Sequence, residues 1–122
     1  MTTRSSDNCI DFIELPVADA AALRRSRQFF SDVFGWNYTA WGDDYADTGS
    51  SGIGSGLNAD PEHRSAMPLA VIHVEDLEAA CAAVLDAGGT LTRDIFSFPG
   101  GRRFHFREPA GNELAVWSEH AS

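Results

Sequence analysis

The sequence has 122 residues, a length typical of one domain, and its 43% hydrophobic and 22% charged residues are proportions found in packed globular proteins. Its formal net charge of −9 argues against nucleic acid and anionic membranes as partners, because a negative surface is repelled by both. No apolar run approaches the ~20 residues of a membrane helix, and the polar N-terminus lacks the apolar segment of a signal peptide, so we expect a cytoplasmic protein.

The first predicted element is a strand over residues 12–19, an apolar run that ends in Val-Ala-Asp and places Asp19 where it can cap a helix. Apolar residues then recur at spacings typical of a helix that ends at Gly35: Leu23, Phe30, Val33 and Phe34. Short extended segments separated by turn residues complete this half: residues 36–41, 45–48 and 52–57. Two prolines and several polar residues within residues 58–68 then predict a linker at about residues 59–67.

The second half repeats this pattern. Residues 69–76 align without a gap with residues 12–19 and end in Val-Glu-Asp, so Asp76 is predicted to cap a second helix. An apolar stripe at helical spacing follows and stops at two glycines: Leu77, Ala80, Cys81, Val84 and Leu85. Three further extended segments follow: residues 91–96, 103–107 and 113–118. The order β-α-β-β-β therefore occurs twice, over about residues 9–58 and 68–118, within a single domain of residues 1–122.

This repeat predicts an α+β fold of two βαβββ half-modules with curved mixed sheets. One such sheet cannot bury its concave face alone, so we expect the two sheets to pair around a cavity lined by alternate strand residues. A concave space of this kind is the usual place for a small-molecule ligand.

Two segments are similar to motifs of a known superfamily: residues 29–36 read Phe-Phe-Ser-Asp-Val-Phe-Gly-Trp, and residues 106–112 read Phe-Arg-Glu-Pro-Ala-Gly-Asn. Together with the repeat, they make the chain resemble the vicinal oxygen chelate superfamily, which includes glyoxalase I, bleomycin-resistance proteins, fosfomycin-resistance enzymes and extradiol dioxygenases. The resemblance covers about residues 12–117. It implies the glyoxalase/bleomycin-resistance fold and a homodimer, since members with two modules in each chain commonly pair.

The resemblance also implies where a metal centre would lie. Metal-dependent members usually place a His on the first strand of each half, and acidic or polar ligands on the last strand of each half. These positions fall on Phe12, Leu69 and Ala115, which have no donor atoms, and on a Ser within residues 52–57. We therefore expect no metal and no other cofactor, and the metal-dependent glyoxalase and dioxygenase reactions do not carry over to this chain.

Glu14 is the first candidate catalytic residue. Strand alternation places it on the face of Phe12, which by resemblance lines the cavity together with Leu69. A carboxylate among apolar side chains suits a general base or a partner for a cationic ligand. The alternative is structural, with Glu14 pairing with an arginine or capping backbone donors.

The strand at residues 103–107 alternates charged and aromatic residues, so Arg103 and His105 share a face opposite two phenylalanines. By resemblance, fosfomycin-type members hold their substrate with polar groups at these two positions. Arginine offers a planar donor fork and histidine an exchangeable proton, a combination that suits a carboxylate, phosphonate or enolate. The alternative is a solvated edge strand whose charges oppose aggregation.

Two more residues are predicted to contact the ligand. His73 is expected at the mouth of the pocket, the alternative being a structural histidine at a strand end. Trp117 lies on the face of Ala115 and is expected to stack on the ligand, the alternative being simple packing. Cys9 and Cys81 lack C-x-x-C spacing and are expected to be buried free thiols.

Three functions are consistent with these residues. The first is a metal-independent protein that binds and sequesters an aromatic or cationic small molecule, as bleomycin-resistance members do. The second is a metal-independent lyase or isomerase in which Glu14, with His105 or Arg103, transfers a proton on a carbonyl compound. The third is an accessory subunit with a vestigial pocket. No feature of the sequence decides among them.

Overall fold

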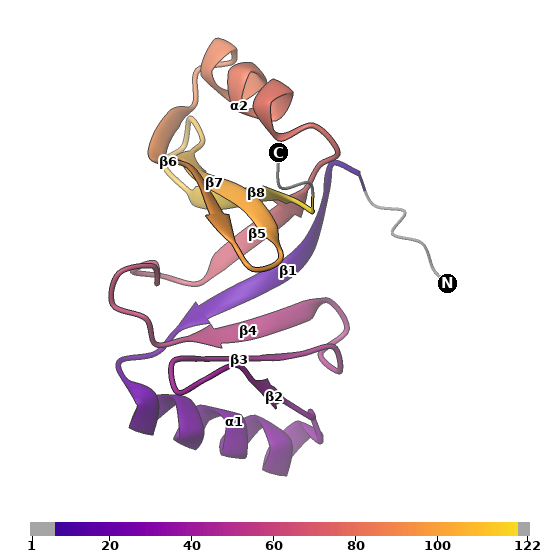
Figure 1. Cartoon of the computed structure of the whole chain (residues 1–122), viewed down its shortest axis with the longest axis vertical. Helices are drawn as coiled ribbons and strands as arrows, with labels where there is room; N and C mark the ends of the chain where they lie inside the picture. The colour runs from indigo at the N-terminus through magenta and orange to yellow at the C-terminus, as the bar shows by residue number, and fades with distance from the viewer. Residues whose placement is uncertain (1–6, 120–122) are drawn as a thin grey trace. The chain divides into compact units, whose positions relative to one another are not determined.

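The computed structural model describes residues 7–119 and confirms the α+β fold with two β-α-β-β-β modules (Figure 1). The described part of the chain divides into two compact units, Phe12–Leu69 and residues 7–11 together with residues 70–119. Each unit contains one helix and the strands on which it packs, and each is described by itself. Among residues 7–119, no helix is long and apolar enough to cross a membrane.

The first module is a sheet packed on one helix. Its elements are β1 (Cys9–Pro16), α1 (Ala20–Phe34), β2 (Thr39–Ala40), β3 (Tyr45–Thr48) and β4 (Gly54–Asn58). The strand order is β2-β3-β4-β1, with β4 parallel to β1 and the other neighbours antiparallel. Strand alternation turns Ala46 and Leu57 toward α1, whose Leu23 completes a buried cluster with them.

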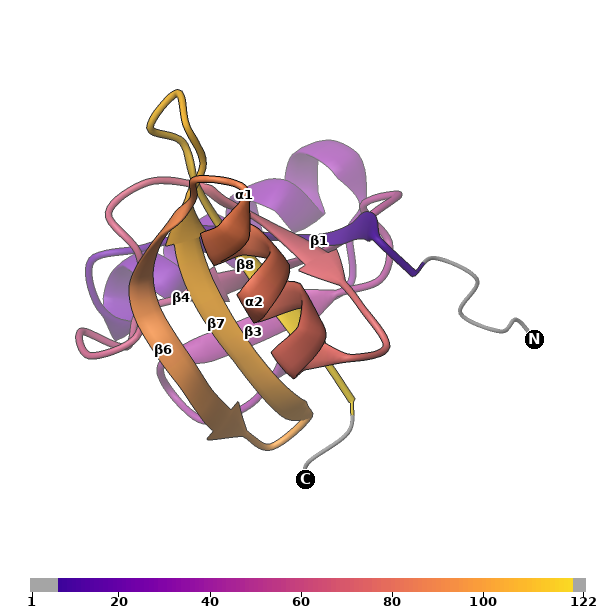
Figure 2. The ribbon, with the colours of Figure 1, turned by 90° about the horizontal axis from the view of Figure 1, so that it is seen from above.

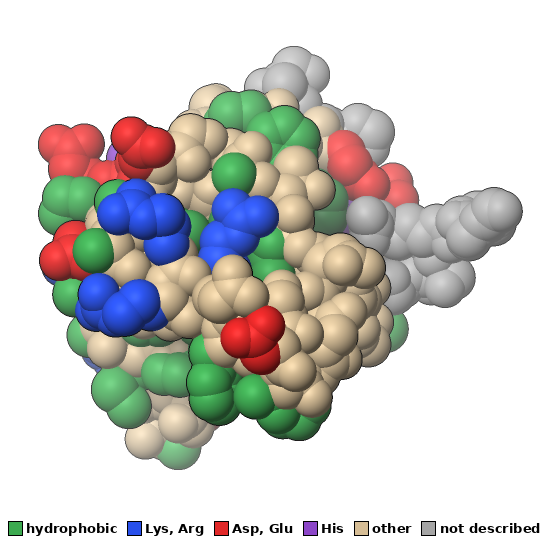
Figure 3. Space-filling view, turned by 90° about the horizontal axis from the view of Figure 1, so that it is seen from below, with side chains coloured by type: hydrophobic (Ala, Val, Ile, Leu, Met, Phe, Trp, Pro, Cys, Tyr) green, Lys and Arg blue, Asp and Glu red, His purple; other side chains and the backbone are tan. Residues whose placement is uncertain are grey.

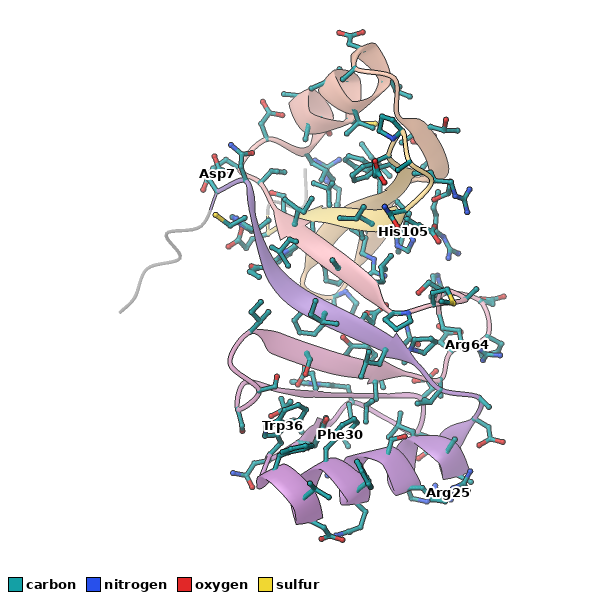
Figure 4. All side chains as sticks on the ribbon, turned by 180° about the vertical axis from the view of Figure 1, so that it is seen from behind. Asp7, Arg25, Phe30, Trp36, Arg64 and His105 are labelled. Carbon is teal, nitrogen blue, oxygen red and sulfur yellow. The ribbon has the colours of Figure 1, made fainter. Side chains whose placement is uncertain are left out.

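The ends of α1 follow the sequence prediction. The carboxylate of Asp19 accepts the backbone N–H of Ala22 at 2.8 Å, which satisfies one of the unpaired donors at the start of the helix. Gly35 ends the helix in the left-handed region, with a φ of 74° that favours glycine. Directly after this cap, Trp36 stacks on Phe30 with ring centroids 5.1 Å apart, and Figure 4 shows both rings between α1 and the strands of this module.

The second module has the same order of elements. They are β5 (Leu69–His73), α2 (Leu77–Asp86), β6 (Thr90–Phe98), β7 (Gly101–Arg107) and β8 (Glu113–Ser118). The strand order is β5-β8-β7-β6, with β5 parallel to β8 and the other neighbours antiparallel. Asp76 caps α2 by accepting the backbone N–H of Ala79 at 3.0 Å. Figure 2 shows α2 lying across β7 and β8.

The core of the second module lies between α2 and its sheet. Phe104, Phe106 and Val116 are buried there against Leu77 of the helix. Because successive strand residues point to opposite faces, burial of both phenylalanines on the helix side turns the side chain of His105 to the other side. The hydrophobic packing under α2 therefore fixes the orientation of the polar residues on β7.

The structure corrects the bounds of some predicted strands. The segment at residues 36–41 forms only the two-residue β2, because Trp36 packs on α1 and Tyr38 packs against the buried cluster of this module. In the second half, β6 extends to Phe98 and β7 begins at Gly101, so this hairpin is longer than predicted.

The cysteines are also placed differently from the prediction. Both thiols are free, as expected, but Cys9 is exposed at the start of β1 and Cys81 is half-buried on α2. The apolar run that suggested burial of Cys9 begins two residues before the strand enters the core, since Ile10 is exposed as well.

Candidate functional site

One face of the second module carries most of the predicted site residues. The strand register places Trp117 of β8 between Arg103 of β7 and His73 of β5. It also places His105 beside Ala115. These five side chains point away from α2, because the alternate residues of the same strands pack under the helix, and Figure 4 shows His105 on this side. We call this surface the helix-free face of the second module.

Arg103 and His105 are directly hydrogen bonded on this face. Arg103 Nε lies 3.2 Å from His105 Nε2 and donates to it. Because a guanidinium has only donors, Nε2 must accept, and the proton of the neutral imidazole lies on Nδ1. That Nδ1 is 3.7 Å from Glu113 Oε2, with the imidazole only 3% exposed. The histidine is therefore fixed in one tautomer between a cation and a carboxylate.

Aromatic rings of β6 frame the guanidinium. The Arg103 Cζ atom lies 5.7 Å from the ring centroid of Phe96 and 6.0 Å from that of Phe98. Phe98 also contacts Trp117, and the centroids of these two rings are 6.3 Å apart. A guanidinium over aromatic faces is held in position by cation–π attraction, and its planar donor fork matches the geometry of a carboxylate.

The position of β7 in the sheet excludes the alternative interpretation of Arg103 and His105. β7 is flanked by β6 on one side and β8 on the other, so it is not an edge strand. The interpretation of Arg103 and His105 as solvated charges that protect a sheet edge is therefore wrong. The burial of His105 agrees with this correction.

Trp117 and His73 form the other end of the helix-free face. The indole N–H of Trp117 donates to Asp11 Oδ1 at 3.0 Å, and its ring meets His73 in an edge-on contact with centroids 5.1 Å apart. His73 is 1% exposed, so it lies beneath the surface and not at an open mouth. Its Nε2 is 2.6 Å from Glu119 Oε1, whereas its buried Nδ1 has no hydrogen-bond partner within residues 7–119.

Glu14 lies in the first module and is 3% exposed. Its carboxylate accepts hydrogen bonds from the Tyr45 hydroxyl at 3.4 Å and from the Asn58 amide at 3.3 Å. Gly56 lies beside it in the register, and a Cβ there would collide with the end of the Tyr45 side chain. The glycine thus makes room for the hydroxyl that holds Glu14. Because Glu14 and the pair Arg103 and His105 belong to different units, their convergence on one site stays a prediction.

The residues at the superfamily's metal positions do not fit a divalent metal. Phe12, Leu69 and Ala115 offer no nitrogen, oxygen or sulfur atom in their side chains. The fourth position was expected to be a serine of β4, but Ser55 pairs with Ile13 and thus lies on the face opposite Phe12. The β4 residues on the face of Phe12 are glycines and Asn58, so the expected serine ligand is wrong.

One cluster of metal-ligating side chain types does occur among residues 7–119. The cluster comprises Asp60, Glu62 and His63, whose ligand atoms lie within 4.8 Å of one another. The Asp60 carboxylate already accepts the backbone N–H of Glu62 at 2.9 Å and contacts His63 Nδ1 at 2.7 Å. These contacts explain the cluster as a capped turn of the linker.

Several residues of the site were missed by the sequence analysis. Phe96 and Phe98 alternate along β6, and this period-two spacing is the signal that could have found them. Asp11 lies within β1 and Glu119 directly follows β8, and they reach Trp117 and His73 through contacts distant in sequence, so no local pattern identifies them.

Two successive βαβββ modules in one chain, each with a helix-free face that carries polar residues, define an α+β protein of the glyoxalase type. A family model described as Glyoxalase/Bleomycin resistance protein/Dioxygenase superfamily matches residues 10–116, so the chain belongs to this superfamily. No curated protein sequence matches it.

Solved structures agree with this assignment. The chain is similar to the Mn(II)-bound glyoxalase from Novosphingobium aromaticivorans, with 20% identity and a TM-score of 0.67 over 95% of this chain and 40% of that chain. It is also similar to methylmalonyl-CoA epimerase from Mycobacterium tuberculosis, with 16% identity and a TM-score of 0.65 over 96% of this chain and 92% of that chain. A superfamily member from Vibrio splendidus 12B01 shows 19% identity and a TM-score of 0.63 over 88% and 96% of the two chains. These likenesses establish the fold.

Proposed function

We propose that this protein binds a small molecule that carries an anionic group on a planar apolar body, and that binding needs no divalent metal ion. The observation that carries the proposal is the guanidinium of Arg103, which is hydrogen bonded to His105 and lies over Phe96 and Phe98. Such an arrangement offers a fixed donor fork for a carboxylate and aromatic surface for the rest of the ligand.

The carboxylates around this face do not argue against an anion. Glu113 accepts the Thr92 hydroxyl at 2.7 Å, Asp11 accepts the indole N–H of Trp117, and Glu119 is paired with His73. Each carboxylate thus already has a hydrogen-bond partner in the protein and does not need a cationic ligand for one. A cationic ligand would meet Arg103 on the same face, and like charges there would repel.

The metal-independent part of the proposal rests on donor chemistry. Divalent cations need several nitrogen, oxygen or sulfur ligands, and the superfamily's ligand positions on β1, β5 and β8 hold Phe12, Leu69 and Ala115. We therefore assign recognition of the ligand to arginine and aromatic side chains.

Isothermal titration calorimetry with benzoate and benzylamine tests this function, because the two probes share a ring and differ in charge. We expect benzoate to bind more tightly than benzylamine, and Arg103→Met to weaken benzoate binding by about 10- to 100-fold, the scale of a charge-assisted hydrogen bond. Arg102→Met is the matched control, since Arg102 is the next residue on β7 but pairs with Glu78 of α2 at 2.6 Å. Equal losses in both variants, or tighter binding of benzylamine, would contradict the proposal.

We also propose that two copies associate through α1. Its outer face carries Phe29 and Val33, which are 57% and 55% exposed, with Arg25 one turn before Phe29 and Asp32 beside Val33. Figure 3 shows this side of the molecule, where basic and hydrophobic side chains lie with an acidic group beside them. An antiparallel pair of α1 helices would place Phe29 near the twofold axis and Arg25 opposite the partner's Asp32, so the surface is complementary to itself.

Light scattering after gel filtration tests the dimer. At micromolar concentration we expect twice the 13.2 kDa mass of one chain for the wild type and the mass of one chain for Phe29→Glu. Arg25→Glu should weaken the dimer, and combining it with Asp32→Arg should restore it, whereas Arg24→Glu on the neighbouring face should have little effect. A wild-type mass of one chain would rule out this association.

A further inference from the structure

The buried Nδ1 atom of His73 is the unexplained polar group of the helix-free face. The ring of His73 is 1% exposed, and its Nε2 lies 2.6 Å from Glu119 Oε1. A carboxylate accepts only, so a ring proton lies on Nε2, and when the imidazole carries this one proton Nδ1 has a lone pair. Among residues 7–119, no side chain or backbone group donates to that atom. A buried acceptor without a donor is unfavourable, so the site is suited to a group that brings one.

The strand register relates this acceptor to Arg103. Trp117 of β8 is paired with His73 on one side and with Arg103 on the other, so the three residues form one row across the sheet. Neighbouring strands are ~4.8 Å apart, which separates the backbones of His73 and Arg103 by about 10 Å. Trp117 thus lies between the guanidinium of Arg103 at one end of this row and the imidazole of His73 at the other.

We propose that His73, oriented by Glu119, is a specificity residue that accepts a hydrogen bond from a hydroxyl group of the ligand. The inference rests on the proposed function, in which Arg103 binds the anionic group of the ligand. His73 would then contact the opposite end of the same ligand. It defines the ligand class as hydroxylated aromatic carboxylates. The ring of such a molecule fits beside Trp117 and Phe98, and its two polar ends match the two ends of the row.

Ligand chemistry gives the first test without any substitution in the protein. Calorimetric titrations would compare benzoate, 3-hydroxybenzoate, 4-hydroxybenzoate and the two corresponding methoxybenzoates. We expect one hydroxybenzoate to bind about 5- to 10-fold more tightly than benzoate, the scale of one hydrogen bond to a buried partner. Its methoxy analogue should lose this gain, because a methoxy oxygen accepts but cannot donate.

Two substitutions of His73 then locate the acceptor. The amide nitrogen of a glutamine reaches the place of Nε2 and can still donate to Glu119, but nothing replaces Nδ1. The amide of an asparagine lies near the place of Nδ1 and gives up the contact with Glu119. We therefore expect His73→Gln to bind benzoate and the hydroxybenzoate equally well, and His73→Asn to keep part of the preference. Thermal unfolding of each variant checks that its fold is intact.

The outcomes separate this inference from the proposed function. If no benzoate binds in an Arg103-dependent way, the proposed function fails and the inference fails with it. If benzoate binding depends on Arg103 but the wild type shows no preference for a hydroxyl, or His73→Gln keeps the full preference, only the role of His73 is refuted. If His73→Gln does not fold, the wild-type protein still provides the test. Equal affinities for the hydroxy and methoxy ligands would refute a hydrogen bond donated by the ligand.

Discussion

The two modules have the same topology but different chemistry on their helix-free faces. Alignment of residues 12–19 with 69–76, combined with the strand registers, makes Gly56 of β4 equivalent to Ala115 of β8 and Asn58 equivalent to Trp117. The first module therefore presents Glu14 over glycines, whereas the second presents arginine, histidine and aromatic rings. The helix-covered faces, by contrast, each contain a buried hydrophobic cluster. The fold fixes the packing under each helix, and the opposite faces are where the modules differ in chemistry.

The largest effects are expected under the helices, where the modules are alike. Phe104→Ala removes a fully buried ring from the second core and should lower the free energy of unfolding by about 3–5 kcal/mol, and Leu57→Ala in the first core should cost about 2–5 kcal/mol. Denaturant unfolding measures both. Met67→Ala, at a side chain that is 70% exposed, is the control and should change stability little. A small loss at either core position would show that the modules are not packed alike.

A second prediction concerns the glycine that distinguishes the first module. Gly56→Ala makes this position identical to its equivalent, Ala115, but the new Cβ would lie 3.1 Å from Phe12 Cζ and would push against the Tyr45 hydroxyl. We expect a loss of about 1–3 kcal/mol from this overpacking, together with displacement of Tyr45 from Glu14. Gly35→Ala, which strains a positive φ without touching the site, is the control. Unfolding and the chemical shift of the Tyr45 ring report the two effects, and an unmoved ring would contradict this account.

The helix caps should be equivalent in the two modules. Asp19 and Asp76 each accept a backbone N–H in the first turn of their helix, at 2.8 and 3.0 Å. Replacing either residue by alanine should cost about 1 kcal/mol, and the double variant should show the sum, because the caps share no partners. Thermal or denaturant unfolding checks this. Asparagine at either position should keep most of the stability, since its amide oxygen also accepts.

The smallest expected effect concerns the turn before the last strand of each module. The two turns should differ in how they make the folding stability depend on pH. The backbone N–H of Ala110 donates to Glu108 at 2.9 Å, and this bond, with those from Asn112, holds the pKa of Glu108 below its usual value. A lowered pKa in the folded state gives stability that is present above the unfolded pKa and lost as the pH falls through the folded pKa.

The corresponding turn of the first module contains no carboxylate between residues 49 and 53. An NMR titration should show Glu108 protonating at a lower pH than an ordinary glutamate, and Glu108→Gln should remove this part of the acid dependence. A normal midpoint for Glu108 would contradict the proposed hydrogen bonding.

Much of this fold follows from local patterns in the sequence. The repeat placed both helices correctly because Asp19 and Asp76 are caps with a direct backbone partner, and the alternation in β7 separated Arg103 and His105 from Phe104 and Phe106. These signals depend on residues a few positions apart, which periodicity captures.

The rest depends on contacts that periodicity does not contain. The pairing of His73 with Glu119 joins positions 46 residues apart, and that of Trp117 with Asp11 joins positions 106 apart. Ser55 was misplaced because the strand register, and not the composition of the segment, decides which residues of β4 share the face of Phe12. Similarly, only the strand order shows that β7 is internal.

The central claim is that the helix-free face of the second module binds an aromatic anion through Arg103 without a divalent metal. The most direct test is a calorimetric titration of benzoate into protein freed of metals by a chelator, repeated after addition of Mn²⁺ or Zn²⁺. This account predicts the same affinity in all samples and a much weaker affinity for Arg103→Met. Binding that disappears on chelation and returns with the metal would contradict it.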